Sequence, residues 1–100
     1  ELGGNAPFIV CADANLELAV RVAVEAKFQT SGQDCCAANR IMVDRSIYSE
    51  FLSRFAAAVR ELRVGPALVD GQEQSVDIGP LMHQAAFDVT AERVADALEL

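Results

Sequence analysis

The stretch Pro7-Phe8-Ile9-Val10 decides the fold, because a short and wholly apolar run of this length predicts a buried strand. Gly3-Gly4-Asn5 precedes it and Asp13 follows it, so turn or capping residues stand at both of its ends. A strand without a polar face is typical of a parallel sheet that is covered on both sides. The fold class predicted from this stretch is therefore α/β.

The residues that follow alternate between helical and extended patterns. Apolar residues recur at helical spacing after Asp13 and Asn15, either of which can cap a helix, and Thr30-Ser31-Gly32 is a stop signal. The expected elements are a helix over residues 13–29, a loop over 33–39, a strand over 40–44, a helix from a Ser46 cap to residue 62, a surface excursion over 66–79 and a helix over 84–100.

Two strands joined through helices imply a parallel sheet with flanking helices, but two strands are too few for a stable open sheet. The architecture is therefore expected to be a partial α/β layer that needs more strands or a second copy of the chain. The last helix shows no stop signal, and apolar residues make up 52% of the 100 residues, against about 45–50% in ordinary domains. We interpret residues 1–100 as one piece of a larger domain, whose bare apolar faces favour a homo-oligomer.

Charge and length exclude several classes of partner. The chain has 15 acidic and 8 basic residues, a formal net charge of -7 and no basic run, so we expect neither nucleic acid nor an anionic membrane surface as a partner. No apolar stretch approaches the roughly 20 residues of a membrane span, and the start does not resemble a signal peptide.

The three cysteines predict reduced thiols. Cys35 and Cys36 are adjacent, and adjacent cysteines rarely form a disulfide because the small ring is strained. The sequence has no Cys-x-x-Cys pair and one histidine, His83, for which we expect a surface or capping role, so we predict no metal site. Reduced thiols fit a reducing compartment, and we expect a cytoplasmic location.

A thiol in the loop between the first helix and the second strand is a candidate nucleophile. Cys35 and Cys36 lie in this loop, Gly32-Gln33-Asp34-Cys35-Cys36-Ala37-Ala38-Asn39-Arg40, whose small residues would let a substrate carbon approach a sulfur. Backbone N–H groups in such a loop can converge on a developing oxyanion. By itself this pattern also fits a small buried hydrophobic residue, which is the role we expect for Cys11.

Several motifs together resemble the aldehyde dehydrogenase superfamily, across essentially the whole chain. Glu1-Leu2-Gly3-Gly4-Asn5 is similar to the family's glutamate signature, and Gly32-Gln33-Asp34-Cys35 to its cysteine signature, at the family's separation of 34 positions. Further matches are Pro7-Phe8-Ile9-Val10, Lys27-Phe28, Asn39-Arg40 and Ile78-Gly79-Pro80-Leu81. The local sequence is most similar to the succinate-semialdehyde dehydrogenase branch. The resemblance makes the chain a segment of the family's thiol-bearing catalytic domain.

The resemblance implies a role for each signature residue. Cys35 would attack a small aldehyde such as succinate semialdehyde to give a thiohemiacetal and then a thioester, while its N–H holds the oxyanion. Glu1 would be the general base that activates the hydrolytic water. Leu2 and Gly3 would contact the cofactor, NAD or NADP. The cofactor-binding domain, however, lies largely outside these residues, so the isolated piece is expected to be inactive.

Two features leave an alternative open. Asp34 precedes the nucleophile where relatives have a small neutral residue, and a carboxylate there would disfavour the thiolate. No Gly-rich phosphate loop occurs in the chain. The alternative is a non-catalytic remnant, or a self-associating acidic interaction module.

Overall fold

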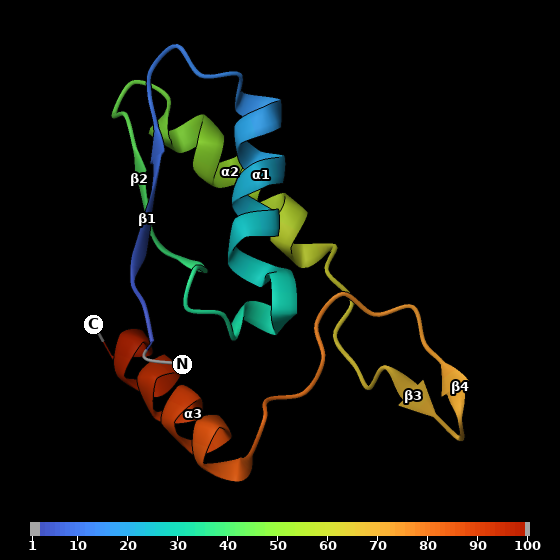
Figure 1. Ribbon diagram of the computed structural model, residues 1–100. Coiled ribbons are helices and arrows are strands. Elements are labelled where there is room, and N and C mark those ends of the chain that lie inside the picture. Colours follow the sequence, from blue (N-terminus) through green and yellow to red (C-terminus); the bar gives the residue numbers. More distant parts are fainter. Residues whose placement is uncertain (1–2, 100) are drawn as a thin grey trace.

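The computed structural model describes residues 3–99, which form a parallel α/β unit with a hairpin and a helix extending from it (Figure 1). The elements are β1 (Ala6–Val10), α1 (Leu16–Phe28), the 3₁₀ turn η1 (Gln29–Gly32), β2 (Ala38–Val43), α2 (Tyr48–Arg60), β3 (Leu68–Val69), β4 (Gln72–Glu73) and α3 (Gln84–Leu98).

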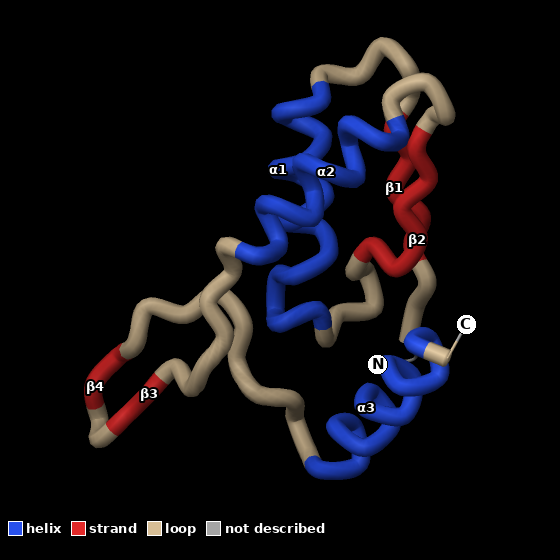
Figure 2. The backbone as a smooth tube through the Cα atoms, turned by 180° about the vertical axis from the view of Figure 1, so that it is seen from behind, coloured by secondary structure: helices blue, strands red, loops and turns tan. Residues whose placement is uncertain are grey.

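Strands β1 and β2 form the parallel sheet that the sequence predicts. Phe8 pairs with Ile41 and Val10 pairs with Val43, and a register shift occurs at the start of β1, between Ala6 and Pro7. Helices α1 and α2 lie on the same side of these strands, as the two opposite views show (Figures 1 and 2). The prediction of a partial parallel sheet with flanking helices is confirmed.

The core lies between the sheet and these two helices. Val10 from β1, Val20 and Ala23 from α1, and Phe51 from α2 are buried, and Phe51 is only 3% exposed. The ring of Phe51 stacks on that of Phe55, with 5.7 Å between centroids and 11° between planes. Apolar residues at helical spacing therefore do form the inner faces of α1 and α2.

The opposite face of the sheet is bare. Side chains alternate between the two faces of a strand, so Ile9 and Met42 point away from the core and are 67% and 46% exposed. This bare face agrees with the partial α/β layer that the sequence predicts, whose apolar faces lack their cover. No described element lies over this face, which carries the apolar side chains Ile9 and Met42 together with Arg40.

Of the N-caps expected for α1 and α2, the one at Asn15 is confirmed and the one at Ser46 is wrong. The side chain of Asn15 accepts a hydrogen bond from the N–H of Leu18 at 3.0 Å, as expected for an N-cap. Ser46 instead donates its hydroxyl to Asp44 at 2.6 Å, and α2 begins two residues later, at Tyr48. These bonds from Ser46 lower the pKa of the Asp44 carboxyl, because they stabilise its charged form.

The surface excursion over residues 66–79 contains a hairpin that the sequence analysis missed. Strands β3 and β4 are antiparallel and are joined by Asp70 and Gly71, whose φ angles are 52° and 78°. Asp-Gly is a strong signal for this two-residue turn, so the pattern could have been found. Arg63 closes the base of the excursion on Asp77 with a 3.1 Å ion pair. Its guanidinium lowers the pKa of Asp77, chiefly through the side-chain hydrogen bond.

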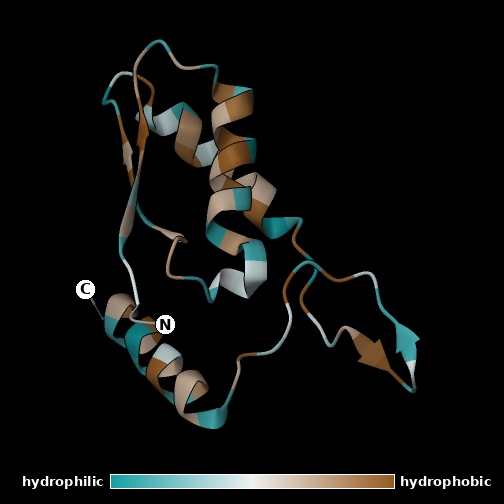
Figure 3. Cartoon of the chain, viewed as in Figure 1, coloured by the Kyte–Doolittle hydropathy of each residue, from teal (hydrophilic) through white to brown (hydrophobic). Residues whose placement is uncertain are grey.

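Helix α3 has the extent expected but not the buried face. The Nδ1 atom of His83 accepts from the N–H of Ala86 at 3.1 Å, which confirms the capping role. The sequence of this helix predicts an inner face made of Ala86, Val89, Val94, Ala97 and Leu98, yet Val89, Val94 and Leu98 are 44%, 55% and 82% exposed. Figure 3 shows hydrophobic positions along this helix, and their exposed fractions show that these side chains remain uncovered. None of the helices within residues 3–99 combines the length and apolarity needed to cross a membrane.

Candidate active site

The turn after α1 sets the position of the cysteine loop. Thr30, Ser31 and Gly32 have φ angles of 52°, 55° and 72°, so three consecutive residues adopt the left-handed conformation. This conformation is disfavoured for residues with a Cβ, and it reverses the chain sharply at the end of the helix. The loop from Gln33 onward therefore runs back toward the sheet and enters β2.

The loop exposes its thiols because the two residues after them are buried. Ala37 and Ala38 are 0% and 4% exposed, whereas Cys35 and Cys36 are exposed. Asp34 holds the turn: its Oδ1 accepts from the N–H of Cys36 at 2.9 Å, and its carbonyl accepts from the N–H of Ala37 at 3.0 Å. Small side chains beneath the turn thus place the sulfur of Cys35 where a substrate can reach it.

The backbone of Gly4 lies directly against Cys35. A Cβ built on Gly4 would stand 1.9 Å from the carbonyl oxygen of Cys35, which is far inside any allowed contact. Only glycine permits this close approach. The described part of the glutamate signature and the segment that carries the cysteine signature are therefore neighbours in the fold.

A short chain of hydrogen bonds fixes this contact. Lys27 on α1 donates its Nζ to the Oδ1 of Asn39 at 2.7 Å, and the Nδ2 of Asn39 donates to the carbonyl of Gly4 at 3.0 Å. Arg40 adds two bonds to the carbonyl of Asn5, at 2.9 and 3.2 Å. The motifs Lys27-Phe28 and Asn39-Arg40 thus hold the segment of Gly4 and Asn5 against β2, a role that the sequence analysis did not assign.

The segment Ile78-Gly79-Pro80-Leu81 docks on the other side of the cysteine loop. The N–H of Gly79 donates to the hydroxyl of Ser31 at 2.8 Å, and the N–H of Met82 donates to the Oε1 of Gln33 at 3.0 Å. Gln33 also reaches the carbonyl of Pro80, at 3.5 Å. The glutamine of the cysteine signature therefore anchors a distant segment beside the thiol.

A cleft of about 280 Å³ opens beside Cys35. Gly3, Gly4 and residues 32–35 line it, so the segments that carry both signatures contribute to its wall. Gly3 has a φ of 78°, and a Cβ added there would meet no atom within 4 Å. The candidate site residues Glu1 and Leu2 lie outside the described residues.

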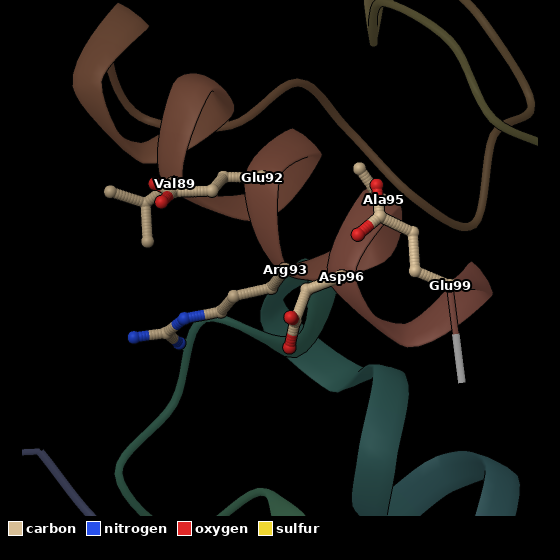
Figure 4. Close-up of a pocket in the computed structure, with 6 residues that line it drawn as sticks. All are labelled: Val89, Glu92, Arg93, Ala95, Asp96 and Glu99. Atoms are coloured by element: carbon tan, nitrogen blue, oxygen red, sulfur yellow. The ribbon is translucent and has the colours of Figure 1, made fainter.

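Two of the other hollows have linings that bear on the search for a site, but neither has comparable chemistry. The larger one, about 600 Å³, lies along α3 and is lined by exposed side chains, among them Arg93 and the acids Glu92, Asp96 and Glu99 (Figure 4). The other, about 300 Å³, lies at the carboxyl ends of β1 and β2 and includes Cys11. Cys11 is exposed, so its expected packing role is wrong in the described chain.

The fold and this site define a parallel α/β unit that presents an exposed thiol in a glycine-lined cleft at the amino ends of its strands. The chain belongs to the aldehyde dehydrogenase family, whose family model matches residues 1–100.

Named relatives and solved structures agree with this family. The chain is 51% identical over 98 residues to a non-phosphorylating aspartate-semialdehyde dehydrogenase of Halomonas elongata, covering 98% of this chain and 19% of the relative. It is 46% identical over 99 residues to an NADP(+) succinate-semialdehyde dehydrogenase of Escherichia coli, covering 99% and 20%. The structure of succinate-semialdehyde dehydrogenase from Burkholderia pseudomallei matches with a TM-score of 0.86 and 43% identity, covering 99% of this chain and 20% of that one. The chain thus spans about a fifth of the length of these relatives.

Proposed function

We propose that these residues form the thiol-bearing segment of an NAD- or NADP-dependent aldehyde dehydrogenase, with Cys35 as its nucleophile. The observation that carries the proposal is the contact between Gly4 and Cys35, together with the cleft that opens beside the exposed sulfur. It brings the two signature segments of the family together at one thiol.

The proposed chemistry begins when the Cys35 thiolate attacks the aldehyde carbon and forms a C–S bond. We assign the N–H of Cys35 to the oxyanion of the resulting thiohemiacetal. Loss of a hydride from this adduct leaves a thioester on Cys35. Glu1 then takes a proton from the water that hydrolyses it to the carboxylic acid.

The cofactor contacts proposed for this chain are Leu2 and Gly3. The glycine lining leaves open space beside Cys35 that fits the flat end of a dinucleotide, but a cleft of about 280 Å³ is smaller than most complete ligand sites, which run from roughly 300 to 1,000 Å³. When bound, the nicotinamide ring of NAD or NADP supplies the hydride acceptor. The phosphate and ribose contacts of this dinucleotide are assigned to residues of the enzyme beyond this segment.

The proposed substrate is a small aldehyde that carries a carboxylate at its other end, such as succinate semialdehyde. The relatives described above are named for the semialdehydes of succinate and aspartate, which share that chemistry. Specificity can be tested by comparing kcat/KM for succinate semialdehyde and for a neutral aldehyde of equal length.

We further propose that the segment acts within a chain of family length, in a cytoplasmic homo-oligomer. The relatives are about five times longer than this segment, which supports a chain of family length. The exposed apolar residues Ile9, Met42 and Leu98 lie on faces that additional structure would cover.

The test of the function is Cys35→Ser in the complete enzyme. Removal of the nucleophile is expected to lower kcat by on the order of 10³-fold or more. Cys11→Ser, at the other end of the sheet, is the matched control and should retain activity. Aldehyde oxidation by a folded Cys35→Ser variant at the rate of the unsubstituted enzyme would overturn the assignment.

The bare face of α3 favours one alternative, a self-associating module without catalysis. Fast and selective labelling of Cys35 by a thiol reagent near neutral pH supports the enzyme. Equally slow labelling of all three cysteines, together with an oligomer in light scattering and no aldehyde oxidation, supports the module.

A further inference from the structure

The sulfur atoms of Cys35 and Cys36 form a close pair without a disulfide. Their Sγ atoms are 3.8 Å apart, whereas a disulfide bond is about 2.05 Å long. One oxygen of the Asp34 carboxylate lies within 4.8 Å of both sulfurs. Three side chains with metal-binding atoms therefore converge at one exposed point of the turn.

The separation of the two sulfurs matches the geometry of a shared metal ion. In a tetrahedral site with Zn–S bonds of about 2.3 Å, two thiolate ligands lie roughly 3.8 Å apart. The observed 3.8 Å equals this spacing before any ion is bound. The two sulfurs would not have to move relative to each other to hold one ion.

The Asp34 carboxylate is held in place to act as a third ligand. The N–H of Cys36 donates to its Oδ1 at 2.9 Å, and an outer hydrogen bond of this kind orients a metal ligand. Two thiolates select soft ions over Mg²⁺ or Ca²⁺, which prefer oxygen ligands. The net charge of -7 also attracts cations.

We propose that Cys35, Cys36 and Asp34 form a binding site for a thiophilic divalent cation such as Zn²⁺ or Cd²⁺. Each cysteine binds through sulfur and releases its thiol proton to solvent, and water completes the coordination. This is an inhibitory site and differs from a structural metal site, which has four protein ligands, whereas this site has three. Inhibition rests on the proposed function, because the ion occupies the sulfur of the nucleophile.

The site is tested by titrating the complete, reduced enzyme with Cd²⁺ and recording the ultraviolet absorption of cadmium–thiolate bonds. Cys36→Ser removes one ligand, and Asp34→Asn removes the carboxylate with little change in shape. Loss of even an outer-shell partner typically weakens metal binding by about 10–100-fold, so Cys36→Ser should weaken it at least tenfold, and Asp34→Asn should weaken it measurably. The control variant Cys11→Ser should bind like the unsubstituted enzyme.

The activity assay separates this proposal from the proposed function. Cys36→Ser should still oxidise aldehyde and should need at least about tenfold more Cd²⁺ for half-inhibition. Equally tight binding by a folded Cys36→Ser variant, or by Cys36→Ala if serine disturbs the fold, overturns the metal site and leaves the enzyme assignment intact. Cys36-dependent binding by a protein that does not oxidise aldehydes supports the site and overturns the enzyme assignment.

Discussion

Substitution of Gly4 by alanine tests the central contact of the site. The added Cβ would stand 1.9 Å from the carbonyl oxygen of Cys35, and contacts of a Cβ below 3.0 Å are essentially never seen. The two backbones must therefore separate by at least about 1 Å. Neither backbone can relieve the clash by rotating a side chain, so Cys35 has to move relative to the segment of Gly3 and Gly4.

The size of the effect follows from this displacement. A misplacement of about 1 Å in an active site can lower the rate on the order of 10²-fold. Overpacking typically destabilises a protein by about 1–3 kcal/mol. We expect Gly4→Ala to lower kcat/KM on the order of 10²-fold. We expect it to lower the free energy of unfolding by about 1–3 kcal/mol, so that the enzyme remains folded.

The assay measures kcat/KM of the complete enzyme beside its denaturant midpoint. Gly65→Ala is the control, because its Cβ would meet only a side-chain methyl group of Val76, at 3.3 Å, which can shift slightly. A folded Gly4→Ala enzyme whose kcat/KM equals that of Gly65→Ala would refute the argument that this contact positions the thiol.

Three further predictions concern the core, the hydrogen-bonded brace formed by Lys27, Asn39 and Gly4, and the base of the hairpin. Phe51→Ala should lower the free energy of unfolding by about 3–5 kcal/mol in denaturant titrations, since the ring is buried; exposed Leu52→Ala, the control, should not. Asn39→Ala removes the link to Gly4 and should lower kcat/KM more than its stability loss of roughly 0.5–1.5 kcal/mol explains; unchanged activity would contradict this. The lowered pKa of Asp77 stabilises the hairpin at pH values above the carboxyl's usual 3.8, and this contribution disappears as pH falls through the lowered pKa. Asp77→Asn should remove that acid-dependent part of hydrogen-exchange protection in the β3–β4 hairpin, and an unaltered pH profile would exclude the ion pair as its cause.

Local sequence patterns correctly predicted the strands and helices whose apolar faces pack against other elements of this chain. The apolar run at residues 7–10 and the helical spacing around Phe51 specify faces that do meet each other, so sheet, helices and core follow from the sequence. The Ser46 cap failed because the hydroxyl bonds to Asp44 instead, a choice between neighbouring partners that composition does not reveal. The inner face of α3 failed because periodicity identifies an apolar stripe without showing what covers it.

The exposure of the Cys35 thiol could be predicted from the sequence, whereas the hydrogen bonds that hold the neighbouring segment in place could not. Small residues around Cys35 indicated an exposed thiol, and the structure exposes it. The brace from Lys27 through Asn39 to Gly4 joins residues 12 and 35 positions apart, and no local rule pairs them. The family motifs had marked these positions, while the contacts that explain them become visible only in the folded chain.

The direction of the two strands has a consequence for locating ligands in folds of this type. Open parallel sheets are usually searched along the edge where their strands finish, because ligands gather there in doubly wound proteins. In this fold the carboxyl ends of β1 and β2 lie at the hollow that contains Cys11. Cys35 precedes β2 and Gly4 precedes β1, so the proposed nucleophile stands at the edge where the strands start. A search guided by strand polarity alone would select Cys11 in its place.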